Sequence, residues 1–100
     1  MAYAILTPEA LRESLSQLHG WQLADNGDAL VREFRFGSFA EAFAFMTRCA
    51  LVAERLDHHP EWFNVYSRVS VRLTTHVVKG LTELDIKLAS AMTDAARRTD

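Results

Sequence analysis

The feature that most constrains the fold is a long segment, residues 38–57, that contains neither glycine nor proline. Ser38 and Glu41 form a capping box, which predicts that a helix begins at this point. At about 100° per residue, two apolar stripes run side by side along the helix and cover roughly half of its circumference. The first stripe contains Phe39, Phe43, Met46, Ala50 and Ala53, and the second contains Phe45, Cys49, Val52 and Leu56.

Two hypotheses explain so much apolar surface on one helix. A helix embedded deeply in its own subunit would bury both stripes. Alternatively, the second stripe packs against another subunit. We favour the second hypothesis because a chain of 100 residues has few elements with which to cover that stripe. The sequence therefore predicts a homo-oligomer assembled through this helix.

Cap signals predict two further helices. Thr7 is a good N-cap and Pro8 fits the first helical position, so a helix is expected over about residues 8–18. Thr82 and Asp85 form another possible capping box near the C-terminal end. The apolar stripe of this last helix consists of Leu84, Leu88, Met92 and Ala95.

Four short segments rich in β-branched and aromatic residues are predicted strands: residues 21–23, 30–36, 62–66 and 69–75. The first two flank a turn at residues 25–28 that contains Asn-Gly, a pair favoured in tight hairpins. The element order is then α-β-β-α-β-β-α. This order predicts a two-layer α+β fold, with a four-stranded antiparallel sheet and the helices on one face.

Composition narrows the class of protein. With 100 residues, 49% of them apolar and 24% charged, residues 1–100 are expected to form a single soluble domain. The lone Cys49 excludes an internal disulfide and fits a reducing, cytoplasmic location. The start of the chain has no signal-peptide pattern, and no apolar run reaches the ~18–20 residues of a membrane helix. A net charge of −2 without charge runs argues against direct binding to nucleic acid or to a membrane.

The histidines are the first candidates for chemistry. His58 and His59 follow the long helix, and His76 follows the last predicted strand. Because histidine titrates near neutral pH, such a cluster suits acid and base catalysis. A plainer interpretation is that His58 complements the helix C-terminus and that the pair before Pro60 only marks the end of the helix. No metal site is expected, because adjacent histidines rarely converge on one ion.

Two carboxylates lie where they could assist the histidines. Glu54 precedes His58 by one helical turn, so the two side chains could pair. Asp85 could act as a cap for the last helix and nothing more. The chain has no phosphate-binding glycine loop and no serine nucleophile elbow, so nucleotide hydrolysis and covalent acyl transfer lack support.

Residues 54–66, 74–76 and 80–85 closely resemble the pterin-4a-carbinolamine dehydratases, a family also known as dimerisation cofactors of a homeodomain transcription factor. The matching pattern is an acidic residue before His-His-Pro, an aromatic residue after it, a later histidine and then an aspartate. Here the pattern consists of Glu54, His58, His59, Pro60, Tyr66, His76 and Asp85. One position departs from the family, since Val77 stands where an acidic residue is common.

The resemblance implies dimers or tetramers that dehydrate 4a-hydroxytetrahydropterin to quinonoid dihydropterin, after aromatic amino-acid hydroxylation and without a cofactor. We expect His58 and His76 to move the protons, His59 to orient the ring and Glu54 to tune His58. Pro60 would fix the chain, and Trp62 would wall the pocket or fill core. The expected substrate-binding residues are Glu54, Asp57, His58, His59, Pro60, Trp62, Thr74, Thr75, His76, Val77 and Asp85.

Two alternatives stay open. The chain could be a protein-binding module whose long helix engages a partner's helices, as coactivator members of the family do. Retention of all the histidines favours the enzyme, because an adaptor has no evident need for a titrating cluster. The chain could also act on another pterin, and Val77 is the feature that keeps this alternative open.

Overall fold

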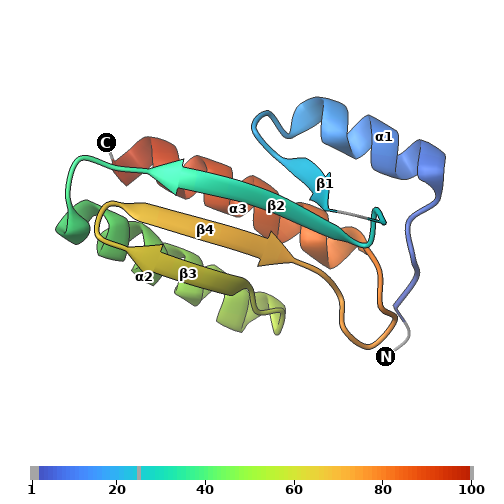
Figure 1. Ribbon diagram of the computed structural model, residues 1–100. Coiled ribbons are helices and arrows are strands. Elements are labelled where there is room, and N and C mark those ends of the chain that lie inside the picture. The colour runs from blue at the N-terminus through green and yellow to red at the C-terminus, as the bar shows by residue number, and fades with distance from the viewer. Residues whose placement is uncertain (1–2, 25, 100) are drawn as a thin grey trace.

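The computed structural model describes residues 3–24 and 26–99 of the chain. These residues form three helices and four strands in the predicted order α-β-β-α-β-β-α (Figure 1). No helix within them is long and apolar enough to cross a membrane. The helices are α1 (Pro8–Gln17), α2 (Phe39–Leu56) and α3 (Glu83–Thr99), and the strands are β1 (Gln22–Ala24), β2 (Ala29–Arg35), β3 (Glu61–Val65) and β4 (Arg68–Leu73).

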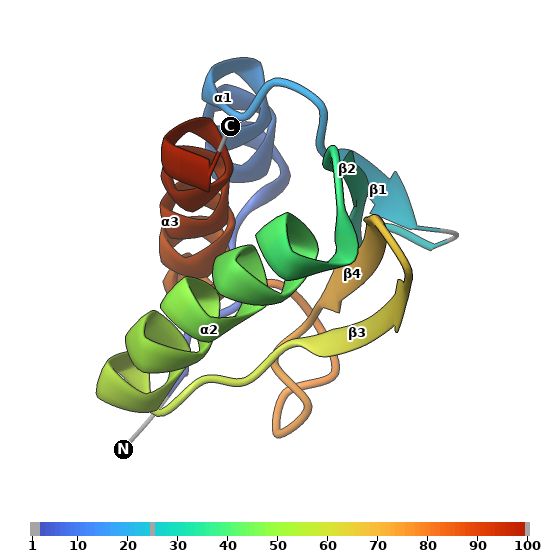
Figure 2. The ribbon, with the colours of Figure 1, turned by 90° about the vertical axis from the view of Figure 1, so that its left-hand side faces the viewer.

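The strands form one antiparallel sheet in the order β1-β2-β4-β3. The two long central strands pair from Leu30 opposite Leu73 to Arg35 opposite Arg68. Figure 2 shows the helices on one side of this sheet, so its other face is open. The predicted two-layer α+β fold is confirmed.

The core lies between the sheet and the helices α2 and α3. Strand β4 alternates strictly, with Val69, Val71 and Leu73 buried and the residues between them partly exposed. Leu88 and Met92 of α3 face these side chains and are fully buried. Each large apolar side chain removed from water contributes about 1.5–3 kcal/mol, so this layer supplies much of the stability.

The buried face of α2 differs from the expected one. Phe45 and Cys49 belong to the second apolar stripe, and both are buried in the core of their own subunit. Phe39 and Phe43 belong to the first stripe, yet they are 51% and 56% exposed. The prediction that the second stripe packs against another subunit was therefore wrong. Ala53 of the first stripe is buried as well, so sequence periodicity located both stripes but could not tell which residues of each face the core.

The turn between β1 and β2 follows the Asn-Gly signal. Gly27 has a φ of 79°, a conformation that glycine adopts without a steric penalty, and its N–H donates to Ala24 O over 2.7 Å. Asp25, which the prediction placed in the same turn, lies outside the described residues.

Candidate active site

The site begins where α2 ends. Asp57 is the C-cap and adopts a left-handed conformation with a φ of 50°, while its N–H donates to Glu54 O. This conformation closes the helix and turns the chain sharply. His58 and His59 consequently leave the helix axis in different directions. His58 turns inward and is buried, whereas His59 stays exposed.

His58 forms a buried pair with Asp85. His58 Nε2 lies 2.6 Å from Asp85 Oδ1, and the two side chains are 9% and 0% exposed. The other carboxylate oxygen, Oδ2, accepts from the Thr75 hydroxyl at 2.7 Å and from the Thr82 N–H at 2.9 Å. Asp85 thus caps α3, as predicted, and also anchors the histidine, so one carboxylate joins α2, α3 and the loop after β4.

The N–H groups around Asp85 and the two threonines set the direction of each hydrogen bond in this network. The Leu84 N–H donates to Thr82 Oγ1 at 3.3 Å, and the two threonine hydroxyls lie 2.8 Å apart. The Thr82 hydroxyl can therefore donate to Thr75, and Thr75 donates to Asp85. An ionised Asp85 carboxylate can only accept hydrogen bonds. A neutral His58 that pairs with it therefore donates from Nε2, the ring nitrogen that lies beside Asp85 Oδ1. The remaining ring nitrogen, Nδ1, is the one left to meet a ligand.

The other two histidines form exposed pairs with glutamates. His59 Nε2 lies 2.7 Å from Glu54 Oε1, and His76 Nε2 lies 2.7 Å from Glu61 Oε2. The expected pairing of Glu54 with His58 was wrong, because the turn at Asp57 carries His58 into the core and leaves Glu54 beside His59. Each histidine of the cluster therefore has its own carboxylate.

His76 reaches the site from a tight loop. Strand β4 ends at Leu73, two residues earlier than expected, and Thr75 then pairs with Gly80 in an isolated bridge. The Lys79 N–H donates to His76 O at 3.2 Å, which closes the loop. The His76 side chain is 68% exposed, and the loop rather than strand β4 sets its direction.

A cavity of about 300 Å³ lies among these side chains. Seven of the predicted site residues line it: Asp57, His58, His59, Pro60, Thr75, His76 and Val77. Glu54 and Asp85 do not line it but contact His59 and His58. The arrangement brings three titratable rings from two separate segments to one small space, as acid and base catalysis requires.

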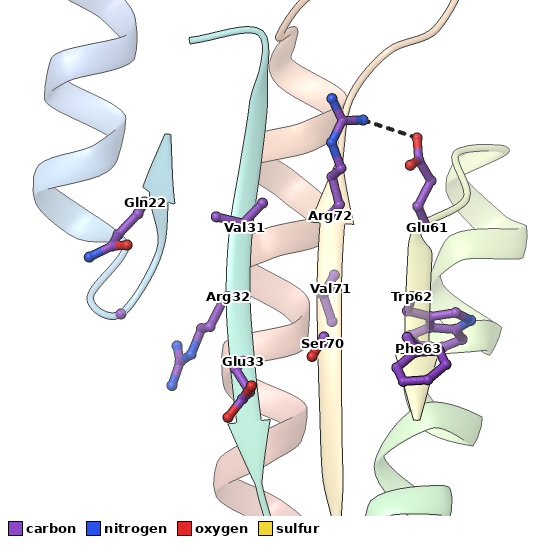
Figure 3. Close-up of a pocket in the computed structure, with 11 residues that line it drawn as sticks. Gln22, Val31, Arg32, Glu33, Glu61, Trp62, Phe63, Ser70, Val71 and Arg72 are labelled. Carbon is purple, nitrogen blue, oxygen red and sulfur yellow. Dashed lines mark hydrogen bonds and ion pairs between the residues drawn. The ribbon is translucent and has the colours of Figure 1, made fainter. Parts of the chain in front are cut away.

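Two predicted site residues lie elsewhere. The Thr74 hydroxyl donates to Asp28 O at 2.7 Å, and the residue is buried away from the cavity. Trp62 packs against the core and lines a different hollow of about 540 Å³ (Figure 3). Its neighbour in β3, Glu61, lines both this hollow and the site cavity.

Two residues that line the cavity were missed in the sequence. Glu61 follows Pro60 directly, and this position next to the His-His-Pro segment was the available signal. Its Oε2 also accepts from Arg72 at 3.2 Å, on the open face shown in Figure 3. Tyr3 comes from the opposite end of the chain, and no local pattern indicates that it reaches the site.

Other chemistry has less support. Burial raises the pKa of the Cys49 thiol to about 12, so this thiol stays protonated near neutral pH and is a poor nucleophile. Within residues 3–24 and 26–99, no three histidine, cysteine or acidic side chains are grouped so that they could hold a metal ion. The histidine–carboxylate pairs remain the main chemical feature of the described chain.

Comparison with known proteins identifies a family. Residues 4–95 match the family model described as pterin 4 alpha carbinolamine dehydratase. A protein of Sinorhizobium fredii named "Putative pterin-4-alpha-carbinolamine dehydratase" is 58% identical over 91 residues, which cover 91% of this chain and 87% of the relative.

Two solved structures resemble the fold. A crystal structure of a transcriptional coactivator/pterin dehydratase from Brucella melitensis has a TM-score of 0.90 and 52% identity, and the match covers 93% of this chain and 99% of that one. A pterin dehydratase-like protein identified as a RuBisCO assembly factor in the alpha-carboxysome has a TM-score of 0.67 and covers 78% of this chain and 90% of its own; at 24% identity, it supports the fold alone. The family model and the close relatives together show that this chain belongs to the pterin-4a-carbinolamine dehydratase family.

Proposed function

We propose that the chain is a lyase that dehydrates 4a-hydroxytetrahydropterin to quinonoid dihydropterin, in the recycling of pterin after aromatic amino-acid hydroxylation. The observation that carries the proposal is the convergence of His58, His59 and His76 on one cavity in a chain of this family. The cavity of about 300 Å³ is at the small end of the range for small-molecule sites.

The reaction makes two demands on protons. The hydroxyl group on C4a leaves as water after it accepts a proton, and N5 loses its proton as the C4a–N5 double bond forms. An acid near the oxygen and a base near the nitrogen satisfy both demands, and the exchange leaves no net proton behind. Histidines can serve in both roles near neutral pH.

The environments of the histidines divide these roles. His58 is the proposed base, because Asp85 holds its Nε2–H and leaves Nδ1 as an acceptor in a fixed orientation. His76 is the proposed acid, since its exposed ring lies 2.7 Å from Glu61 and can exchange protons with water. His59, paired with Glu54, orients the flat ring of the substrate.

A direct assay tests the proposal. The chain is added to a phenylalanine hydroxylase reaction, and the decay of the 4a-carbinolamine absorbance is followed. We expect faster decay with the unmodified chain and with His19→Ala, whose histidine does not line the cavity, but only the uncatalysed rate when all three site histidines are replaced. Equal decay with and without the unmodified chain would remove the enzyme assignment.

We also infer that the chain forms a homo-oligomer, a dimer or a tetramer, through α2. The exposed face of this helix carries Phe39, Phe43 and Leu51, and the last is 62% exposed. At about 100° per residue these positions fall within one arc of roughly 120°. The rings of Phe39 and Phe43 lie 5.8 Å apart and form a continuous apolar surface. Such a surface favours a self-complementary interface.

The second candidate function is a coactivator that binds a protein partner. The name of the Brucella melitensis structure includes a transcriptional coactivator, and the same exposed face of α2 would receive a partner's helix. The two functions depend on different residues. Replacement of the three histidines would abolish dehydration and leave partner binding intact. A charge introduced at Phe43 would weaken partner binding more than it lowers dehydration.

A further inference from the structure

Tyr3 lies at the cavity but belongs to none of the segments that the family pattern contains. It is half-buried and lines the same space as His58, His76 and Val77. Most of the other lining residues are polar or charged. Among the described lining residues, Tyr3 carries the sole aromatic carbon ring, and Pro60 and Val77 are the other apolar members.

The segment before α1 holds Tyr3 in this position. The Leu6 N–H donates to Leu81 O at 2.9 Å, which ties the segment to the loop between β4 and α3. The Leu6 side chain packs against the core. The Ile5 side chain lies close to Gly80, since a Cβ atom placed on this glycine would be 3.5 Å from Ile5 Cδ1. This loop also carries His76. The segment that carries Tyr3 is thus tied, at Leu6, to the loop that carries the proposed acid.

A flat bicyclic substrate needs two kinds of contact. Its polar edge and its C4a and N5 groups suit the carboxylates and histidines of the cavity, whereas its faces are apolar and are best covered by an aromatic or aliphatic surface. The histidines in the cavity are engaged in pairs with carboxylates. Tyr3 is the lining residue best suited to cover a face of the ring.

We propose that Tyr3 contacts the bicyclic ring of the pterin and contributes to substrate binding rather than to proton transfer. This inference depends on the proposed dehydratase function. The expected consequence is a change in KM with little change in kcat, because the contact would be the same for the substrate and the transition state.

The test compares substitutions at position 3. We expect Tyr3→Ala to raise KM for the 4a-carbinolamine roughly 5–30-fold, as the loss of one aromatic contact predicts, and to change kcat less than about threefold. Tyr3→Phe should retain the KM of the unmodified chain within about threefold. Tyr3→Leu, which keeps bulk but not the flat ring, should fall between them. Calorimetric titration with 6-methylpterin should rank the Kd values of the variants in the same order as their KM values.

Tyr66→Ala is the matched control, because Tyr66 is 66% exposed in the turn between β3 and β4 and does not line the cavity. Thermal unfolding of each variant separates a loosened segment from a lost contact, and Tyr3→Leu provides a second test if Tyr3→Ala is unstable. Equal KM and Kd for the unmodified chain, Tyr3→Ala and Tyr3→Leu would overturn the inference about Tyr3 alone. An unmodified chain that neither binds 6-methylpterin nor dehydrates the carbinolamine would overturn the proposed function, and the inference with it.

Discussion

Two histidine–carboxylate pairs of the site have almost the same geometry and very different surroundings. His58 and Asp85 lie 2.6 Å apart with side chains 9% and 0% exposed, whereas His76 and Glu61 lie 2.7 Å apart with side chains 68% and 45% exposed. A short contact in water contributes about 0–1 kcal/mol, because solvent screens the charges. The same contact in the core cannot lose one partner without leaving the other desolvated and unpaired.

The comparison shows how one cluster can combine rigidity with proton exchange. Thr75 and Thr82 fix the orientation of Asp85, and Asp85 in turn holds His58 Nε2, so the buried ring has a fixed position beside the cavity. The exposed His76 is in contact with water and can recover a proton after each turnover. Burial, rather than the N–O distance, therefore distinguishes the proposed roles.

Removal of Asp85 should have the largest effect. We expect Asp85→Ala to lower the free energy of unfolding by at least about 1–3 kcal/mol, because it leaves the His58 and Thr82 N–H donors unpaired inside the core. Denaturant unfolding of this variant beside Glu61→Gln measures the contrast. A loss below about 1 kcal/mol for Asp85→Ala would show that the buried pair behaves like an exposed one.

Single replacements of the two proposed proton-transfer residues should lower dehydration by about 10²–10⁴-fold. His58→Ala should also destabilise the fold, because Asp85 loses its buried partner, whereas His76→Ala should leave the unfolding midpoint nearly unchanged. The dehydration rate and the free energy of unfolding, measured on the same preparations, would distinguish the effects of the two replacements. Full activity in both variants would contradict the roles assigned here.

The same contrast between buried and exposed positions applies along α2. Phe43→Glu places a charge on a side chain that is 56% exposed and should shift the oligomer to smaller species while the subunit stays folded. Val52→Glu, at a partly buried position packed on the core, should instead destabilise the subunit. Light scattering combined with circular dichroism distinguishes these results. A monomeric unmodified chain at micromolar concentration would contradict assembly through α2.

The exposed ion pairs should contribute least to stability. Arg72→Gln removes one of the two donors to Glu61 Oε2, and we expect the free energy of unfolding to change by less than about 1 kcal/mol. Arg68→Gln is the matched control, because Arg68 lies on the same strand and its Nε is 3.9 Å from Glu33 Oε1. A change above 2 kcal/mol for Arg72→Gln, well outside the range for exposed pairs, would mean that the exposed network carries part of the fold.

Metal removal should have no effect. Prolonged chelation followed by elemental analysis is expected to leave the dehydration rate unchanged and to find no stoichiometric zinc or iron, since the proposed chemistry uses histidine protons. Loss of activity on chelation, with recovery on addition of one metal, would contradict a mechanism based on the histidine–carboxylate pairs alone.

Local signals in the sequence were sufficient for the order of elements and for the histidine cluster, whereas the resemblance to a known family supplied the other expected site residues. Capping at Ser38 and Thr7 is visible in the structure as hydrogen bonds to the N–H groups of Glu41 and Ala10. The capping box at Thr82 and Asp85 is present as well. These features depend on residues three positions apart, which a helix brings together whatever the rest of the chain does. The histidine cluster was visible for a related reason, since two of its members are adjacent.

Tertiary structure decided which alternatives were realised. Both stripes of α2 are apolar, so the choice of Phe45 over Phe43 for the core depended on where α3 and the sheet lie. The partner of Glu54 depended on the backbone turn at Asp57. Tyr3 and His76 are separated by most of the chain and share a cavity because the segment before α1 is hydrogen-bonded to the loop after β4. Such contacts depend on how separate elements pack, and no pattern within one segment contains that information.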